Sequence, residues 1–183
     1  MKEEFPDLLT SRLLLREIGE KDLPALFAIF SSKHTMKYYG SELIQNMEEA
    51  EGVLMSFQKG FENQQAVRWG IARKDTNEII GTCGFHNWSK RVGRIELGYD
   101  LIEEAEGKGY MSEALSAIIP YGFDELQLNR IGALIHQDNS SSRKLVHKLG
   151  FQEEGILRDY AFARGNYIDL IMHSLLKKDW RKS

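Results

Sequence analysis

A glycine-rich segment in the second half of the chain has the composition of an anion-binding loop. Residues 106–114 read EGKGYMSEA, follow a strand-like stretch at 94–101 and open a helix-like stretch that ends near Leu126. Glycine lets the backbone approach a ligand closely, and the first amides of a helix lack internal partners, so such a loop favours phosphate. We therefore expect the amides of residues 107–112 to bind an anion. Taken alone, the motif is equally typical of an ordinary turn.

The hydrophobic pattern predicts the elements that must position this loop. Strands are expected near 13–18, 67–71, 79–85, 94–101, 130–136, 151–162 and 167–176, and helices near 22–30, 46–61, 110–126 and 139–150. Strands that alternate with helices and end in a hairpin predict an α/β protein with a mixed sheet.

Local signals indicate where several elements begin and end. Asp22 and Asn46 are expected to cap the first two helices, and Glu49 completes a capping box with Asn46. The second helix carries an apolar stripe that predicts a core-facing side: Met47, Ala50, Leu54, Phe57 and Phe61. Pro120 should kink the helix after the glycine loop. Gly165-Asn166 should form the turn of the final hairpin.

Composition bounds the class of protein. The 183 residues suit one domain with a sizeable core, and the formal net charge of −3 argues against a sequence-independent nucleic-acid binder. Cys83 is the only cysteine, so no internal disulfide can form, and its apolar surroundings predict a core residue. No signal peptide or membrane span is expected, which predicts a cytoplasmic protein. The histidines lack metal-ligand spacing, so no metal is expected: His34, His86, His136, His147 and His173.

Several short motifs follow one another in a characteristic order. They are Gly107-Lys108-Gly109-Tyr110, Glu113-Ala114, Asn139 with Ser142, Lys148-Leu149-Gly150-Phe151 followed by Glu154-Gly155, Arg158-Asp159-Tyr160, and Asp169 with Ser174-Leu175-Leu176. On these residues the chain from Leu13 to Trp180 resembles the GCN5-related N-acetyltransferases (GNAT). Within that superfamily it is similar to the subgroup that acts on the N-terminal amine of ribosomal proteins.

The resemblance implies one GNAT domain over residues 1–183. Its acyl-CoA N-acyltransferase fold is a mostly antiparallel sheet flanked by helices and splayed between the fourth and fifth strands. The implied cosubstrate is acetyl-CoA, with its pyrophosphate on the amides of residues 107–112 and its pantetheine arm added as a strand along residues 99–101. The implied cofactor-binding residues are Tyr99, Asp100, Leu101, Gly107, Lys108, Gly109, Tyr110, Met111, Ser112 and Asn139. Asn139 would bond the cofactor arm, cap a helix, or do both.

The implied chemistry is direct attack of a neutral amine on a thioester. Glu96 is the candidate base because it lies beside the thioester on the polar strand face; the alternative is a solvated carboxylate or a partner of Arg94. Ser142 matches the serine that donates to the departing sulfur; the alternative is a helix N-terminal serine that satisfies its own backbone. Many members use a tyrosine as the acid where this chain has Val146, so Ser142 or water must serve.

Three further positions depart from the family pattern. Glu106 replaces an arginine or glutamine and is expected to point to solvent, because a carboxylate opposes phosphate. Met111 replaces a small residue but would act through its backbone N–H. Ala161 stands where the close relatives that act on a ribosomal stalk protein carry a glutamate, which argues against a strict copy of their mechanism and of their substrate.

The leading hypothesis is therefore an acetyl-CoA-dependent N-acetyltransferase whose acceptor is a protein N-terminal amine. Its alternatives are an enzyme for a small amine, such as a polyamine, an amino acid or an antibiotic, and a non-catalytic acyl-CoA sensor. The loops at 33–45 and 85–93 would set the substrate. Neither nucleic acid nor a membrane is an expected partner, and a homodimer stays open.

Overall fold

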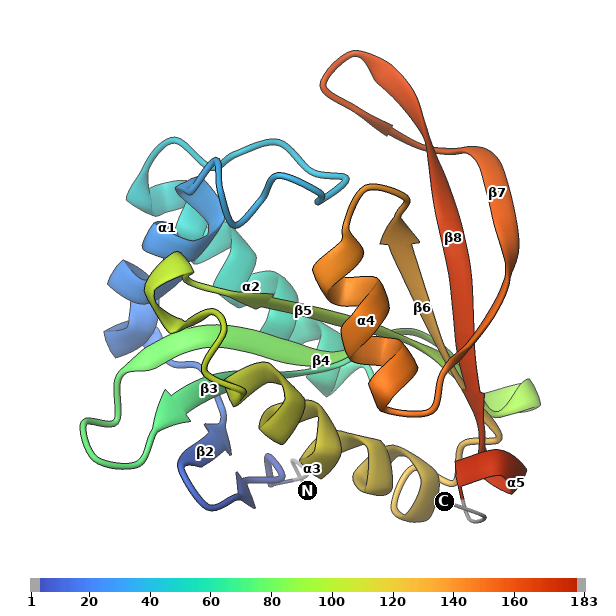
Figure 1. Cartoon of the computed structure of the whole chain (residues 1–183). Coiled ribbons are helices and arrows are strands. Elements are labelled where there is room, and N and C mark those ends of the chain that lie inside the picture. The colour runs from blue at the N-terminus through green and yellow to red at the C-terminus, as the bar shows by residue number, and fades with distance from the viewer. Residues whose placement is uncertain (1–3, 181–183) are drawn as a thin grey trace.

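The computed structural model describes residues 4–180, whose strands form one eight-stranded sheet (Figure 1). The strands are β1 (Leu8–Leu9), β2 (Leu13–Arg16), β3 (Val67–Arg73), β4 (Ile79–Ser89), β5 (Arg94–Leu101), β6 (Arg130–His136), β7 (Gln152–Ala163) and β8 (Asn166–Leu176). Their order in the sheet is β1-β2-β3-β4-β5-β6-β8-β7. The helices are α1 (Leu23–Ser31), α2 (Met47–Glu62), α3 (Tyr110–Asp124), α4 (Ser140–Lys148) and α5 (Lys177–Trp180), with 3-10 turns η1 (Glu20–Asp22), η2 (Lys90–Val92) and η3 (Glu103–Ala105).

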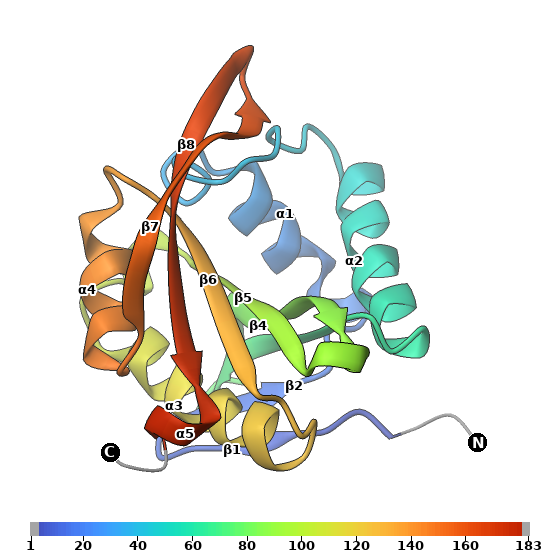
Figure 2. The same ribbon diagram turned by 90° about the vertical axis from the view of Figure 1, so that its right-hand side faces the viewer.

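Helices cover both faces of the sheet. Figure 2 shows α1 and α2 on one face and α3 and α4 on the other. Two hydrophobic clusters correspond to these layers. The larger one includes Trp69, Phe85, Ile118 and Phe123, and the smaller one includes Leu26 and Leu54 of the α1–α2 pair. Cys83 is buried in the larger cluster, as its apolar neighbours predict.

The sheet splits between β5 and β6, which confirms the predicted splay; the two-residue β1 shifts the strand count by one. These two strands run parallel and pair only at Arg94↔Arg130, Ile95↔Ile131 and Glu96↔Gly132, while all other neighbours are antiparallel. Beyond Glu96, β5 pairs only with β4, so its other edge is open. Both views show β6, β8 and β7 leaning away from β5 (Figures 1 and 2).

Some motif residues of the resemblance hold this C-terminal half together. Glu154 on β7 accepts hydrogen bonds from both terminal nitrogens of Arg130 on β6, at 2.6 and 2.5 Å, and from Ser174 on β8, at 2.7 Å. Glu154 and Ser174 therefore join three strands.

The structure corrects several local predictions. Asp22 precedes α1, but its carboxylate accepts from the Arg16 guanidinium and the Gly19 amide instead of capping that helix, because the buried arginine is the stronger donor. Asn46 does cap α2 through the Glu49 amide, whereas the Glu49 carboxylate reaches back to the Gln45 amide.

Other boundaries differ by one or a few residues. The hairpin turn is Arg164–Gly165, both with positive φ, and Asn166 already pairs with Ala163, as in a two-residue type I′ turn. Met47 is 41% exposed at the first position of α2, so the buried stripe starts at Ala50. β4 runs to Ser89, beyond the predicted end, because it pairs with β5.

The helix after the glycine loop also ends earlier than predicted. α3 ends at Asp124, two residues before Leu126, and it continues through Pro120. The kink expected at Pro120 stays a prediction.

Candidate active site

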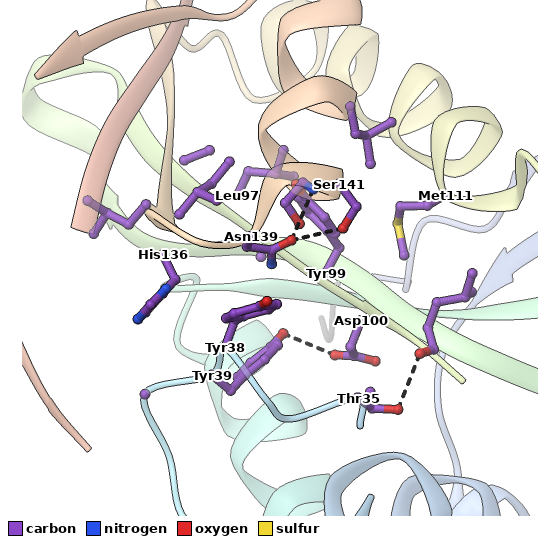
Figure 3. A pocket seen from close by; sticks show the side chains of 18 of the residues that line it. Thr35, Tyr38, Tyr39, Leu97, Tyr99, Asp100, Met111, His136, Asn139 and Ser141 are labelled. Carbon is purple, nitrogen blue, oxygen red and sulfur yellow. Dashed lines mark hydrogen bonds between the residues drawn. The ribbon is translucent and has the colours of Figure 1, made fainter. Parts of the chain in front are cut away.

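A cavity of about 980 Å³ opens where β5 and β6 diverge (Figure 3). Its wall is built from these two strands, the first turns of α3 and α4, the segment before α2 and the final hairpin. Eleven of the twelve predicted site residues line it: Glu96, Tyr99, Asp100, Leu101, Gly107, Gly109, Tyr110, Met111, Ser112, Asn139 and Ser142. Lys108 does not line it.

One end of the cavity is the glycine loop. Gly107 and Gly109 have φ of +71° and +80°, a left-handed conformation that side chains disfavour, and they turn the chain into α3. The first helical hydrogen bond runs from the Glu113 amide to the Gly109 carbonyl, at 3.0 Å. The amides of residues 110–112 precede it and have no partner inside the helix, so this end suits an anion.

Arg12, which sequence reasoning did not single out, supports the loop from the β1–β2 turn. Its Nη1 donates to the Lys108 carbonyl at 3.0 Å, its guanidinium carbon lies 4.4 Å from the centre of the Tyr110 ring, and its Nε donates to Glu113 at 2.7 Å. The Glu113 carboxylate would otherwise oppose a phosphate at this helix end. Arg12 neutralises that charge, from about a hundred residues earlier in the chain, where no spacing pattern reveals it.

Hydrogen bonds hold Glu113 in its ionised form. Its Oε1 accepts from the Thr10 hydroxyl at 2.6 Å, the Ser11 hydroxyl at 2.9 Å and the Arg12 amide at 2.7 Å. Burial acts to raise the pKa of Glu113, but the hydrogen bonds from Thr10 and Arg12 outweigh it and bring the pKa to about 2.

Glu113 should therefore make the fold sensitive to acid. Its stabilising contribution is complete above the unfolded-state pKa of about 4.3 and is lost as the pH falls toward 2, because only the unfolded chain takes up the proton readily in that interval. We expect Glu113→Gln to lower the free energy of unfolding at pH 7 and to flatten its decline between pH 4.5 and 3, measured by urea unfolding. Glu51→Gln, at an exposed position of α2, is the control. Parallel pH curves for Glu113→Gln and the unaltered protein would contradict this account.

At the other end of the cavity Glu96 is held by residues of β4. His86 lies opposite Glu96 in the β4–β5 pairing, and the register shifts between His86 and Ser89. This irregularity brings Asn87 within reach, and its Nδ2 donates to Glu96 Oε2 at 2.9 Å. The partners of Glu96 are thus Asn87 and His86, whose Nε2 lies 3.6 Å from the same oxygen, instead of Arg94.

His86 is a second functional candidate that the sequence did not reveal. Partial burial lowers its pKa, the Arg68 charge lowers it further, and Glu96 opposes both. His86 is therefore neutral at pH 7 and able to accept a proton. Only the β4–β5 register, which no histidine spacing discloses, brings it beside Glu96.

Further along β5 from Glu96, a buried hydrogen-bond network around Asp100 holds the strand in place. The fully buried Asp100 carboxylate accepts hydrogen bonds from Arg68 Nη2 at 2.5 Å and from the amide and hydroxyl of Thr82 at 2.9 and 2.8 Å. It also accepts one from the Tyr39 hydroxyl at 3.1 Å (Figure 3). The Asp100 side chain is thus committed to the protein, and only its main chain is free for a ligand.

Asn139 and Ser142 meet at the start of α4. Asn139 Oδ1 accepts from the Ser142 amide at 3.1 Å and from the Ser141 hydroxyl at 2.9 Å, so Asn139 caps the helix, one of the two roles considered for it. Val146 is fully buried one turn later. The Ser142 side chain lies beside the buried hydroxyl of Tyr99.

The outer side of the cavity is bridged by contacts between the final hairpin and the segment before α2. Arg164 donates from Nη2 to the Met36 carbonyl at 2.7 Å and from Nη1 to the Lys37 carbonyl at 3.3 Å. Ala161 lines the cavity near Gly40. The half-exposed Glu106 reaches His34 at 3.1 Å and does not point only to solvent.

Two absences hold for residues 4–180. No cluster of three or more potential metal-binding side chains forms, and no helix there is long and apolar enough to cross a membrane.

Comparisons with known proteins fit this architecture. Residues 12–152 match the acetyltransferase (GNAT) domain family. The chain is 42% identical over 173 residues to the uncharacterized N-acetyltransferase YoaA of Bacillus subtilis, covering 94% of this chain and 98% of the relative. It is 30% identical over 181 residues to the [ribosomal protein uS5]-alanine N-acetyltransferase of Escherichia coli, covering 94% and 92%.

Among solved structures, RimJ of Mycobacterium smegmatis in complex with CoA-disulfide superposes with a TM-score of 0.86 over 94% of this chain and 88% of that one. At 19% identity this likeness concerns the fold alone. The chain belongs to the GNAT family and is an N-acetyltransferase. Its relatives include enzymes of the ribosomal-protein acetyltransferase subgroup, which the motifs had indicated.

Proposed function

We propose that the chain transfers the acetyl group of acetyl-CoA to the N-terminal α-amine of a protein, such as a ribosomal protein. One observation carries the proposal: Glu96, beside a neutral His86, lies where the open edge of β5 begins, in the same cavity as the glycine loop. The unpaired edge of β5 thus runs between an anion-binding site and a proton acceptor.

The donor end fits the expected cosubstrate. The amides of residues 110–112 would hold the pyrophosphate, while the main chain of residues 99–101, unpaired on the β6 side, would bond the pantetheine amides. Acetyl-CoA supplies the activated acetyl group when bound. A side chain at Gly109 would be strained by its φ of +80°, although its built Cβ meets only the Arg12 side chain, at the ordinary contact distance of 3.4 Å.

Acid–base roles follow from the positions in the cavity. Glu96, 18% exposed, would take the proton from the incoming amine, with His86 as its neighbour in proton exchange. Ser142, at the opposite wall on α4, would donate to the departing sulfur. Asn139 holds the first turn of α4 and therefore positions Ser142.

Charge at the acceptor end favours a single amine over a polyamine. Of the described acidic residues that line the cavity, Asp100 is paired with Arg68 and Glu106 lies at the loop end beside His34. Glu96 alone is left near the acceptor, and a polyamine carries several cations that need separate carboxylates. A protein acceptor of this kind would make the enzyme cytoplasmic.

Proton chemistry adds a preference for the α-amine. A chain-terminal amine has a pKa near 8, so roughly a tenth is neutral at pH 7, against less than about 0.1% for lysine, whose pKa is near 10.4. The 30% identical relative named for alanine acetylation on uS5 supports the same direction.

We expect peptides that begin with Ala or Ser to be acetylated on the α-amine in preference to an internal lysine. Mass spectrometry of a reacted peptide that bears both amines measures this, and the same peptide with a blocked N-terminus is the control. Lysine-only modification, or turnover restricted to polyamines, would overturn the proposal in favour of a small-amine or lysine acceptor.

A further inference from the structure

The Tyr99 side chain presents an unusual polar atom in the cavity wall. Its hydroxyl is buried, and among residues 4–180 it is the one buried side-chain nitrogen or oxygen atom without a hydrogen-bond partner. A buried hydroxyl without a partner costs about 1–3 kcal/mol, so native proteins rarely keep one without a use. The nearby Asn139 side chain is satisfied by the Ser142 amide and the Ser141 hydroxyl.

The location of this hydroxyl indicates what it serves. Tyr99 lies on the open stretch of β5 and faces α4, on the sheet side opposite Glu96 and Asp100. Ser142 lies beside its hydroxyl without completing a hydrogen bond. Figure 3 shows Tyr99 below the first turn of α4, next to Asn139 and Ser141. The two hydroxyls therefore converge between the strand edge and the helix.

We propose that the Tyr99 hydroxyl donates a hydrogen bond to the thioester sulfur and stabilises the negative charge that gathers there as the C–S bond breaks. This role rests on acetyl-CoA as the donor proposed above. This role would replace that of the tyrosine which many family members carry where this chain has Val146, because the Tyr99 hydroxyl would reach the sulfur from β5 instead of from α4.

The pKa values of Tyr99 and of the thiol decide whether Tyr99 transfers its proton or only donates a hydrogen bond. Burial raises the pKa of Tyr99 to about 12, while an ordinary alkyl thiol has a pKa near 8.5. Full proton transfer to the thiolate would be uphill, so Tyr99 keeps its proton and acts as a donor. As the N–C bond forms, the amine proton goes to Glu96. The C–S electron pair goes to sulfur, and the released thiolate takes its proton from solvent water.

Tyr99→Phe isolates this hydroxyl because it keeps the ring. The free protein should melt at an equal or higher temperature than the unaltered protein, since the variant loses only an unpaired buried group. Turnover should fall by roughly 10- to 100-fold in kcat, the worth of a hydrogen bond to a charged group.

Comparing the binding of CoA with that of desulfo-CoA, which lacks the sulfur, tests the contact between Tyr99 and the sulfur in the absence of an amine substrate. Calorimetry should show that the unaltered protein prefers CoA and that Tyr99→Phe loses most of this preference. Tyr167→Phe, at an exposed position of the hairpin, is the matched control. If Tyr99→Phe keeps the full preference for CoA, the inference is wrong although acetyl transfer stands. If neither ligand binds the unaltered protein, the proposed function fails as well.

Discussion

Replacing Glu96 by glutamine should lower kcat by about 100- to 10,000-fold, the usual worth of a positioned acid or base. Glutamine keeps the size of the side chain and can still accept the hydrogen bond from Asn87, so the cavity should retain its shape. What is lost is the ability to take a proton. Acetyl-CoA affinity should stay close to that of the unaltered protein, because Glu96 lies away from the glycine loop.

Steady-state thiol release and calorimetry separate the two quantities. Glu125→Gln, exposed just after α3, is a matched control that should leave both unchanged. His86→Gln removes the neighbouring proton acceptor but leaves the carboxylate, so its loss in kcat should be smaller than that of Glu96→Gln. Near-full turnover of Glu96→Gln across pH 6–9 would mean that water or the substrate amine carries the proton.

Short-range patterns predicted the parts of the site that one stretch of chain builds. The glycine loop, its helix and the cap at Asn139 each depend on neighbours within four residues, and the structure reproduces them. The alternation along β5 placed Glu96 and Tyr99 on opposite faces of the sheet for the same reason. The order of the recognised motifs then predicted the opening of the sheet between β5 and β6, which the local hydrophobic pattern alone does not predict.

Contacts between segments far apart in the chain could not be predicted from the sequence. Arg12 reaches Lys108 from the β1–β2 turn, and Arg68 on β3 reaches Asp100 on β5 across β4; only the fold brings these residues together. His86 entered the site through the β4–β5 register, and a one-residue change in register would have turned it away. Histidine spacing along the chain contains no information of this kind.

The resemblance predicted that Asp100 binds the cofactor through its main chain, as part of strand addition along residues 99–101. The structure adds a role for its side chain, because the carboxylate bonds Arg68, Thr82 and Tyr39 and so fixes the strand whose edge the cofactor would use. The sequence did not reveal these side-chain partners.

Gly109→Val should weaken acetyl-CoA binding by about 100-fold or more. At φ +80° a β-branched residue is strained, and its side chain would stand where the backbone must approach the pyrophosphate. Loss of two hydrogen bonds to a charged group is enough for a change of this size. Relief of the strain by a shift of the loop would also turn the amides of residues 110–112 away from the phosphate.

Stability has to be separated from binding in this experiment, since a left-handed non-glycine residue costs about 1–2 kcal/mol by itself. Thermal melts of the free variant report that cost, and calorimetry with acetyl-CoA then reports the site. Gly19→Val is the matched control: Gly19 has φ −115° and open space around its built Cβ, so the same substitution is unstrained there. A folded Gly109→Val protein that binds acetyl-CoA as tightly as the Gly19→Val protein would rule out this loop as the pyrophosphate site.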